Sequence, residues 1–265
     1  SALIENENLG QADHTDMLNI SISPTDVAGH SFGPNSMEME DMFLRFDQYL
    51  ENFLLFLDKK IGKGNYLLYL TADHGANAAS GFLREHNLPS GSLNPKNLMK
   101  ELNESCRREF GLMPLQSVYS YQFYLNKKRI DSSGIERARI ERFVLNELRK
   151  RPEIQWAFSY DDFEKVSLPS RLKDMFVNGF YPGRSGDIQI VVKPQYSNYG
   201  NAGVDHAAWY NYDTHIPLLW YGSQIPTGRS CREVNITDIA PTIAALLGIP
   251  MPGSSTGKVL GEVVK

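Results

Sequence analysis

Cysteine and long apolar runs are both scarce in this chain of 265 residues. Its two cysteines, Cys106 and Cys231, lack a spacing typical of metal sites, so they are either two free thiols or one disulfide. No apolar stretch has the length needed to cross a bilayer, and the densest one covers only residues 53–57. We therefore expect no membrane span. The polar, acidic N-terminal stretch also lacks the features of a signal peptide.

A large excess of one charge is missing as well. The chain has 27 Lys and Arg against 31 Asp and Glu, and its formal net charge is −4. Proteins that bind nucleic acid usually present a basic face, so this balance predicts no nucleic-acid surface. The apolar fraction of 42% is ordinary for a globular protein that buries a core. The sequence leaves the oligomeric state open.

Hydrophobic periodicity in the first part of the chain predicts an α/β arrangement. Residues 17–23 alternate and are β-prone, so they are predicted to form a strand. Ser36 is expected to cap a helix whose apolar residues recur three and four apart as far as Leu57. A second strand is expected at 66–70. A strand, a helix and a strand in this order predict a mostly parallel sheet flanked by helices.

The helices and strands predicted for the rest of the sequence divide the chain into three parts. Residues 1–80 are expected to form the first part of the α/β core, 81–200 a mixed α+β insertion or cap, and 201–265 the last part of the core. The elements expected after residue 80 are helices at 95–110, 131–150 and 236–247, and strands at 154–160, 188–192 and 216–222.

Acidic residues and histidines occur together at three places. Asp26 and His30 are spaced i, i+4, and they share one side if this segment makes a helical turn. Asp73 and His74 directly follow the strand at 66–70, and a third pair, Asp205-His206, precedes the strand at 216–222. Open α/β sheets bind ligands beyond the carboxyl ends of their strands. Taken alone, Asp26 also fits a turn residue after Pro24, and His30 an ordinary loop histidine.

The chemistry of these pairs indicates a metal site. Carboxylate oxygens and neutral imidazole nitrogens together suit zinc or another divalent transition ion. The chain has only six histidines, and three of them lie in these motifs. Paired metals about 3.5–4 Å apart commonly serve displacement at phosphorus, because they hold the attacking and leaving oxygens together. A two-metal phosphoryl-transfer site is therefore favoured over three unrelated turns.

These motifs resemble a known family. The stretches Thr-Asp-Val-Ala-Gly-His-Ser-Phe-Gly-Pro at 25–34, Thr-Ala-Asp-His-Gly at 71–75 and Asp-His at 205–206 resemble the alkaline phosphatase superfamily. They are most similar to its type I phosphodiesterase/nucleotide pyrophosphatase branch, and within it to the monomeric bacterial alkaline phosphatases. Residues 17–75 and the last sixty residues carry the similarity best. The resemblance implies an alkaline-phosphatase-like fold and two divalent ions, most simply zinc.

The resemblance also implies ligands. One zinc would be held by Asp26, His30 and a late histidine. His206 is favoured for that position, because the family's ligand lies in a loop before the final core strand. His215 abuts the strand and is either the alternative ligand or a residue that orients a ligand. The second zinc would be held by Asp73 and His74.

The family's nucleophile has no counterpart here. The family takes a threonine or serine nucleophile and one more aspartate ligand from a segment before its first strand, whereas only sixteen residues precede residue 17. Asp13 and Asp16 there lack the expected context, and Ser23, Thr25 and Thr71 are interpreted as hydrogen-bonding residues at strand ends. The chain is thus expected to be the C-terminal portion of a longer enzyme and to be inactive alone.

The function implied by the resemblance is hydrolysis of small phosphate esters. The expected reaction is that of an alkaline-phosphatase-like phosphomonoesterase acting through a covalent phosphoenzyme. The alternatives are a phosphodiesterase/nucleotide pyrophosphatase or a sulfatase of the same superfamily, or a non-catalytic metal-binding module. The resemblance further implies a periplasmic or secreted location.

Overall fold

The computed structural model describes residues 1–198, 203–222 and 225–264. Contacts divide the chain into two compact units. Unit 1 comprises Ser1–Thr25, Glu40–Gly75 and His215–Lys265, and unit 2 comprises Asp26–Met39 and Ala76–Thr214. The three-part division expected from the sequence, 1–80, 81–200 and 201–265, stays a prediction.

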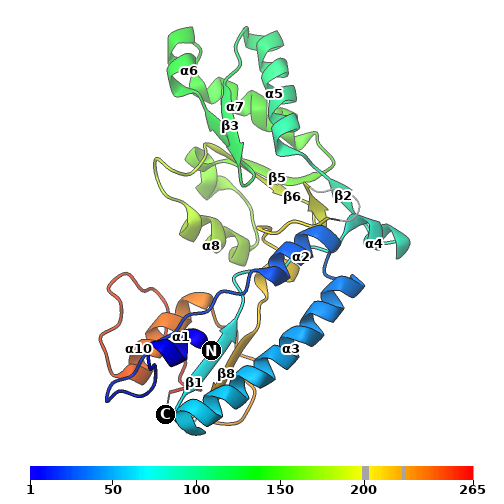
Figure 1. Cartoon of the computed structure of the whole chain (residues 1–265). Coiled ribbons are helices and arrows are strands. Elements are labelled where there is room, and N and C mark those ends of the chain that lie inside the picture. The colour runs from blue at the N-terminus through cyan, green and yellow to red at the C-terminus, as the bar shows by residue number, and fades with distance from the viewer. Residues whose placement is uncertain (199–202, 223–224, 265) are drawn as a thin grey trace. The chain divides into compact units, whose positions relative to one another are not determined.

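Unit 1 is built around a pair of antiparallel strands (Figure 1). In this pair Leu67 lies opposite Gly222 and Thr71 opposite Leu218. Gly222 has φ 137°, and a Cβ atom there would lie 2.3 Å from the carbonyl oxygen of Tyr66, so this position requires glycine. The elements are α1 (Ala2–Asn6), most of α3 (Met37–Leu57), the π-helical turn η1 (Asp58–Gly62), β1 (Leu67–Thr71), β8 (Leu218–Gly222), η3 (Ile236–Asp238) and α10 (Ile239–Leu247).

The strand predicted at 17–23 is wrong. No strand is assigned there, and its apolar side chains are exposed, Ile20 to 60%. A strand needs a ladder partner for its backbone groups, and among the described strands β1 pairs only with β8. A side-chain hydrogen bond, from Tyr69 Oη to Asn19 Oδ1 at 3.1 Å, links this segment to β1. The expected parallel pairing of the first two strands is therefore not observed.

Unit 2 contains a four-stranded antiparallel sheet in the order β3-β4-β6-β5. Helix α5 packs against β3, and α7 packs against β5 and β6 (Figure 1). The core between them includes side chains that are completely buried, such as Phe123, Ile140 and Leu148. The elements are α2 (Pro24–Phe32), α4 (Ser80–Glu85), β2 (Gly91–Ser92), α5 (Pro95–Phe110), β3 (Leu115–Tyr119), β4 (Gln122–Leu125), α6 (Lys127–Ser133), α7 (Arg137–Arg149), β5 (Ile154–Ser159), η2 (Tyr160–Lys165), α8 (Ser170–Gly179), β6 (Ile188–Val192), β7 (Tyr196–Ser197) and α9 (Asn211–Thr214).

Most of the other predicted elements are confirmed. The helices at 95–110 and 236–247 form as expected, and so do strands within 154–160, 188–192 and 216–222. The helix expected at 131–150 is instead two helices, because Gly134 adopts a left-handed conformation (φ 70°) that ends α6. Helix α8 and strands β3 and β4 were not expected.

The remaining sequence expectations concern the membrane and the thiols. Among the described residues, no helix combines the length and the apolar character that a bilayer crossing requires. Cys106 and Cys231 are both free thiols, and Cys106 is buried in the core of unit 2. Burial raises the pKa of the Cys106 thiol to about 12.

Candidate metal centre

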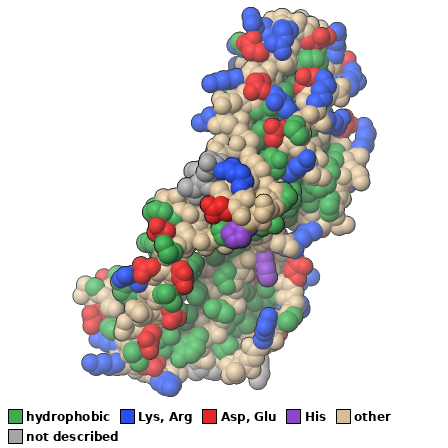
Figure 2. Space-filling model, turned by 90° about the vertical axis from the view of Figure 1, so that its right-hand side faces the viewer, with side chains coloured by type: hydrophobic (Ala, Val, Ile, Leu, Met, Phe, Trp, Pro, Cys, Tyr) green, Lys and Arg blue, Asp and Glu red, His purple; other side chains and the backbone are tan. Residues whose placement is uncertain are grey.

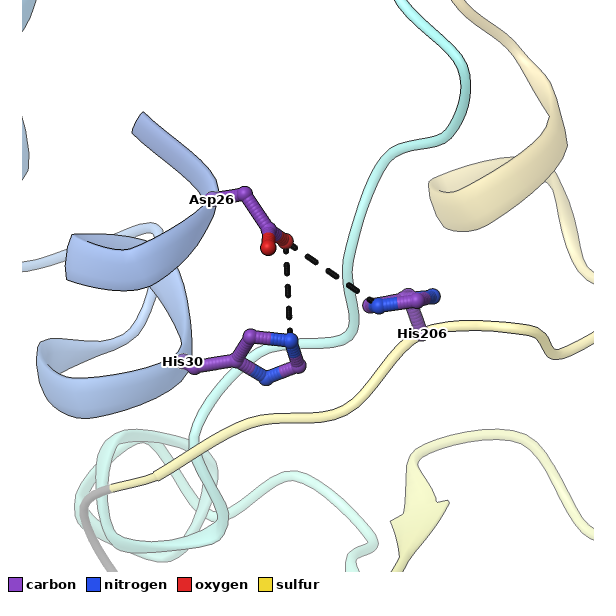
Figure 3. Close-up of side chains that lie close together, drawn as sticks. All are labelled: Asp26, His30 and His206. Atoms are coloured by element: carbon purple, nitrogen blue, oxygen red, sulfur yellow. Dashed lines mark ion pairs between the residues drawn. The ribbon is translucent and has the colours of Figure 1, made fainter. Parts of the chain in front are cut away.

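Asp26 and His30 lie one turn apart on α2, in unit 2. The helix starts at Pro24, whose missing N–H costs nothing in a first turn, and the i, i+4 spacing places both side chains on one side. Asp26 Oδ1 is 3.5 Å from His30 Nε2 (Figure 3). The helical turn that the sequence argument required for this pair is therefore present.

His206 approaches the pair from a loop 176 residues further along the chain. Its Nε2 lies 4.0 Å from Asp26 Oδ1, and its ring centroid is 5.0 Å from that of His30 (Figure 3). One donor atom from each of the three residues lies within 4.8 Å of the others. The side chains are 46% (Asp26), 27% (His30) and 30% (His206) exposed, so a small ligand can reach them.

The orientation of the His30 ring fits a cation at this position. Its Nδ1 lies 2.8 Å from the carbonyl oxygen of Val204, which can only accept a hydrogen bond. In a neutral ring this arrangement puts the proton on Nδ1 and a lone pair on Nε2. That lone pair faces the carboxylate of Asp26, another acceptor, at 3.5 Å. Either a proton on the ring or a metal ion is needed to stabilise two acceptors that face each other in this way.

The loop that carries His206 is held by hydrogen bonds within unit 2. Val204 N donates to the carbonyl of His30 at 3.1 Å, which joins the loop to α2. Asp205 N donates to Asn77 Oδ1 at 2.9 Å, and Asn77 N donates to the carbonyl of Asp205 at 3.3 Å. Beyond His206, the carboxylate of Asp213 accepts from Ala208 N at 2.6 Å. This network fixes both sides of the histidine.

Two of these positioning residues were missed by the sequence argument. Asn77 is 4% and Asp213 is 2% exposed, so both are nearly buried polar side chains. Asn77 is part of the Ala-Asn-Ala run after Gly75, and nothing in its local pattern indicates a partner 128 residues away. Asp213 lies in the Tyr-Asp-Thr-His stretch at 212–215, and its residue type and spacing do not indicate a partner in the loop after His206.

Asp73 and His74 lie in unit 1, directly after β1. Asp73 Oδ2 is 3.7 Å from His74 Nε2, while His74 Nδ1 is 2.8 Å from the carbonyl oxygen of Gly75. This repeats the pattern of His30: one ring nitrogen is bonded to a carbonyl, and the other faces a carboxylate. Asp73 is largely exposed and His74 is half-buried. The pair therefore offers one oxygen and one nitrogen to an ion.

The other candidate residues of unit 1 lie outside the group of three. His215 is exposed and directly precedes the segment that leads into β8. Thr71 Oγ1 donates to the carbonyl of Pro217 at 2.8 Å, a hydrogen bond between the ends of two paired strands. Thr25 Oγ1 donates to the carbonyl of Ile22 at 3.3 Å. Both threonine hydroxyls thus donate to backbone carbonyls.

The donor set of Asp26, His30 and His206 matches the chemistry of a catalytic zinc site. Such sites use three protein ligands, drawn from imidazole nitrogen, carboxylate oxygen and thiolate, and leave a further position for water or substrate. One carboxylate and two imidazoles meet that description, and hydrogen bonding of the second ring nitrogen, as at His30, is the usual way a ligand ring is oriented.

The comparison with known families identifies the class of protein. Residues 1–217 match the family "Type I phosphodiesterase / nucleotide pyrophosphatase". The match covers well over half of the chain, so the chain belongs to this family. Its fold is accordingly the α/β fold of that family, as the motifs indicated.

Particular relatives fall within the same branch. The chain is 40% identical over 265 residues to alkaline phosphatase PafA of Elizabethkingia meningoseptica, covering 99% of this chain and 48% of PafA. It is 39% identical to alkaline phosphatase PhoV of Synechococcus elongatus, covering 100% of this chain and 48% of PhoV. The crystal structure of PafA superposes with a TM-score of 0.95 over 100% of this chain and 51% of the PafA chain. The chain thus spans about half the length of the curated relatives that it matches.

A more distant neighbour shares only the fold. Human ectonucleotide pyrophosphatase/phosphodiesterase 5 superposes with a TM-score of 0.56 at 19% identity, over 86% of this chain and 54% of the human chain.

Proposed function

We propose that this chain carries the metal-binding residues of a zinc-dependent hydrolase of small phosphate monoesters, of the alkaline phosphatase type. The observation that carries the proposal is the convergence of Asp26, His30 and His206, with their donor atoms within 4.8 Å of one another. The names of PafA and PhoV support phosphatase activity. The family description favours diesters and pyrophosphates as the alternative substrates.

The chain's own residues supply ligands and hold them in place. Asp26 contributes a carboxylate oxygen, and His30 and His206 contribute Nε2 nitrogens. The carbonyl of Val204 keeps the proton of His30 on Nδ1. Asn77 and Asp213 fix the backbone on either side of His206. A divalent ion bound there would supply positive charge that stabilises the negative oxygens of a phosphoryl group.

Asp73 and His74 are proposed to hold a second zinc. They present one oxygen and one nitrogen, which is fewer ligands than a tight zinc site provides. We therefore expect this second site to bind zinc more weakly than the group of three.

No nucleophile is assigned among the residues of this chain. The threonines at 25 and 71 have hydrogen-bond partners of their own, and neither matches the family's nucleophile. We propose that the chain alone binds zinc and phosphate but turns phosphate esters over at a rate close to background.

The charge distribution and the similarity to relatives also support proposals about the partners and the location of the protein. Lys and Arg side chains are interspersed with Asp and Glu on the face drawn in Figure 2. Together with a formal net charge of −4, this supports a small-molecule substrate and no nucleic-acid surface. A periplasmic or secreted location is proposed from the similarity to bacterial alkaline phosphatases.

Calorimetric titration with inorganic phosphate tests the proposed function. The zinc-loaded chain should bind phosphate, and the chain stripped with a chelator should not. Asp26→Ala should lose both zinc and phosphate, whereas Asp41→Ala, which removes an exposed carboxylate on α3, should keep both. Phosphate binding that is equal with and without zinc would contradict the proposal. Turnover of a chromogenic phosphate monoester well above background would contradict the absence of a nucleophile.

A further inference from the structure

A cavity of about 170 Å³ lies in unit 2 beside the loop that carries His206. Its aromatic lining residues are Tyr160 in η2, Phe176 in α8 and Trp209. The exposed residues Ser120, Gly179 and Ala207 also line it and open it to solvent. No charged side chain is among the lining residues, all of which belong to the described part of the chain.

The aromatic walls are held by other rings. Trp209 and Phe176 have their ring centroids 5.1 Å apart, and Phe176 packs edge-on against the buried Phe158 at 5.2 Å. Tyr160 stacks on Phe180 at 4.6 Å. Such contacts fix the ring positions before any ligand arrives, which lowers the cost of ordering them on binding.

Two amides hold the hydroxyl end of Tyr160. Its Oη donates to Gln189 Oε1 at 3.1 Å, and Gln122 Nε2 donates to the same Oη at 3.5 Å. Burial raises the pKa of the Tyr160 hydroxyl to about 12, so the ring stays neutral at physiological pH. Both amides also bond elsewhere in unit 2, Gln189 to the carbonyls of Tyr121 and Ile190. The amide side chains of Gln122 and Gln189 therefore hold the ring of Tyr160, one wall of the cavity, in place.

Size and chemistry select a flat, uncharged group. An apolar cavity of about 150 Å³ accommodates a benzene ring, so 170 Å³ has room for one six-membered ring. No cationic side chain lines the cavity, so it offers a phosphate group no charged partner. Aromatic faces attract other aromatic rings in offset or edge-on contact.

Two lining residues of the cavity lie close along the chain to one of the three candidate metal ligands, His206. Ala207 directly follows His206, has φ 69°, and is a lining residue, as is Trp209. Consecutive Cα atoms are 3.8 Å apart, so the Cα atoms of His206 and Trp209 are separated by at most about 11 Å. A wall of the cavity and a candidate metal ligand therefore lie on one short segment of the chain.

We propose that this cavity binds the aromatic ring of a phosphate ester whose phosphoryl group is held at Asp26, His30 and His206. The inference rests on the proposed function and names aryl-bearing esters as its preferred substrate class.

A substitution that narrows the cavity tests whether an aromatic ring binds there. Gly179 is the last residue of α8 and lines the cavity, and a Cβ atom added there would meet nothing within 4 Å. Gly179→Leu would add a branched side chain at the exposed rim of the cavity and should narrow it, whereas Gly179→Ala should leave most of it open. Val177→Leu is the matched control, since Val177 is exposed on the same helix and does not line the cavity.

Binding is read from the indole N–H signals in a ¹H–¹⁵N NMR titration of the zinc-loaded chain. The chain has three tryptophans, and a Trp209→Phe variant assigns the relevant signal. The probes are phenylphosphonate, methylphosphonate and benzyl alcohol. Phenylphosphonate and benzyl alcohol should shift the Trp209 signal, and methylphosphonate should not. Phenylphosphonate should bind about tenfold or more tightly than methylphosphonate, and Gly179→Leu should abolish that difference while Val177→Leu keeps it.

The outcomes separate the two proposals. If neither aromatic probe shifts the Trp209 signal, or if Gly179→Leu leaves the preference intact, the cavity is not a ring site and the inference is overturned. If benzyl alcohol shifts the signal but neither phosphonate binds in a zinc-dependent way, the proposed function fails, and with it the role of the ring site in substrate binding. Zinc-dependent methylphosphonate binding without a ring preference supports the function and overturns this inference alone.

Discussion

At the scale of single residues, the geometry of the candidate metal centre depends on side chains that offer no metal ligand. Asn77 is the clearest example, since its amide oxygen accepts from Asp205 N and its own N–H bonds the carbonyl of Asp205. Residue type, spacing and the family resemblance could single out Asp26, His30 and His206 as candidate ligands, and the structure brings these three side chains together. Local sequence could not predict Asn77, because its role arises only from a contact 128 residues away.

Asn77→Ala should weaken zinc binding by about tenfold, the lower end of what removal of a residue that supports a ligand costs. The loop from 203 to 206 would lose one of its two links to Asn77, and the part-buried backbone N–H of Asp205 would lose its acceptor. Calorimetric titration with zinc measures the change. Asn52→Ala, which alters an exposed asparagine on α3, should leave the affinity unchanged. Equal affinities for Asn77→Ala and the unchanged chain would show that the loop does not depend on this residue.

Glu262 and Arg232 provide a pH-dependent test within unit 1. Arg232 Nε and Nη2 lie 2.7 and 2.8 Å from the two carboxylate oxygens of Glu262, and this pairing lowers the Glu262 pKa from 4.5 to about 2. Because the folded-state pKa is depressed, any stability from the pair is present above pH 4.5 and is lost as pH falls toward 2. The effect should be small, since both side chains are exposed and screened by solvent.

An NMR titration of the Glu262 carboxyl carbon should therefore show a midpoint near 2, and Arg232→Ala should move it back toward 4.5. Added salt should move the midpoint in the same direction as the variant does. A midpoint that is the same in both proteins would contradict the pairing.

At the scale of helices and strands, the sequence pattern predicted those elements that depend mainly on interactions between residues close together in the chain. The helix starting after Ser36 forms because Ser36 Oγ accepts from Met39 N at 3.3 Å and its apolar residues recur with helical period. The break at Gly134 was missed, although glycine favours the left-handed conformation that ends α6. The strand expected at 17–23 is absent for a different reason. Alternating polar and apolar residues indicate only that one face of a segment can be buried, whereas a strand also needs a neighbouring strand to pair its backbone groups.

A residue on helix α7 provides a stability test of the core of unit 2. Leu148 is completely buried in the cluster with Ile140 and Val144. Leu148→Ala should lower the free energy of unfolding by about 2–5 kcal/mol, through lost burial and the cavity left behind. Asn146→Ala, on the exposed side of the same helix, should change it by less than about 0.5 kcal/mol. Urea denaturation followed by circular dichroism compares the two, and similar midpoints would contradict the assigned core.

At the scale of the whole molecule, the chain contributes two sets of acid–imidazole pairs from two units. Asp26, His30 and His206 belong to unit 2, and Asp73 and His74 belong to unit 1. The resemblance of the motifs, which extend over both ends of the chain, was enough to predict the α/β fold of this family. The four-stranded antiparallel sheet of unit 2 was beyond prediction, since its strand order β3-β4-β6-β5 depends on contacts between segments far apart in sequence.

The most direct test of the account is calorimetric titration of zinc into the chain and into His206→Ala and His215→Ala variants. We expect one tight zinc site per chain, with a weaker second site. His206→Ala should lose the tight site, because only two of its three ligands remain. His215→Ala should keep it, since His215 lies outside the group of three. A tight site that survives His206→Ala, or one that is lost in His215→Ala alone, would contradict the assignment of the metal centre.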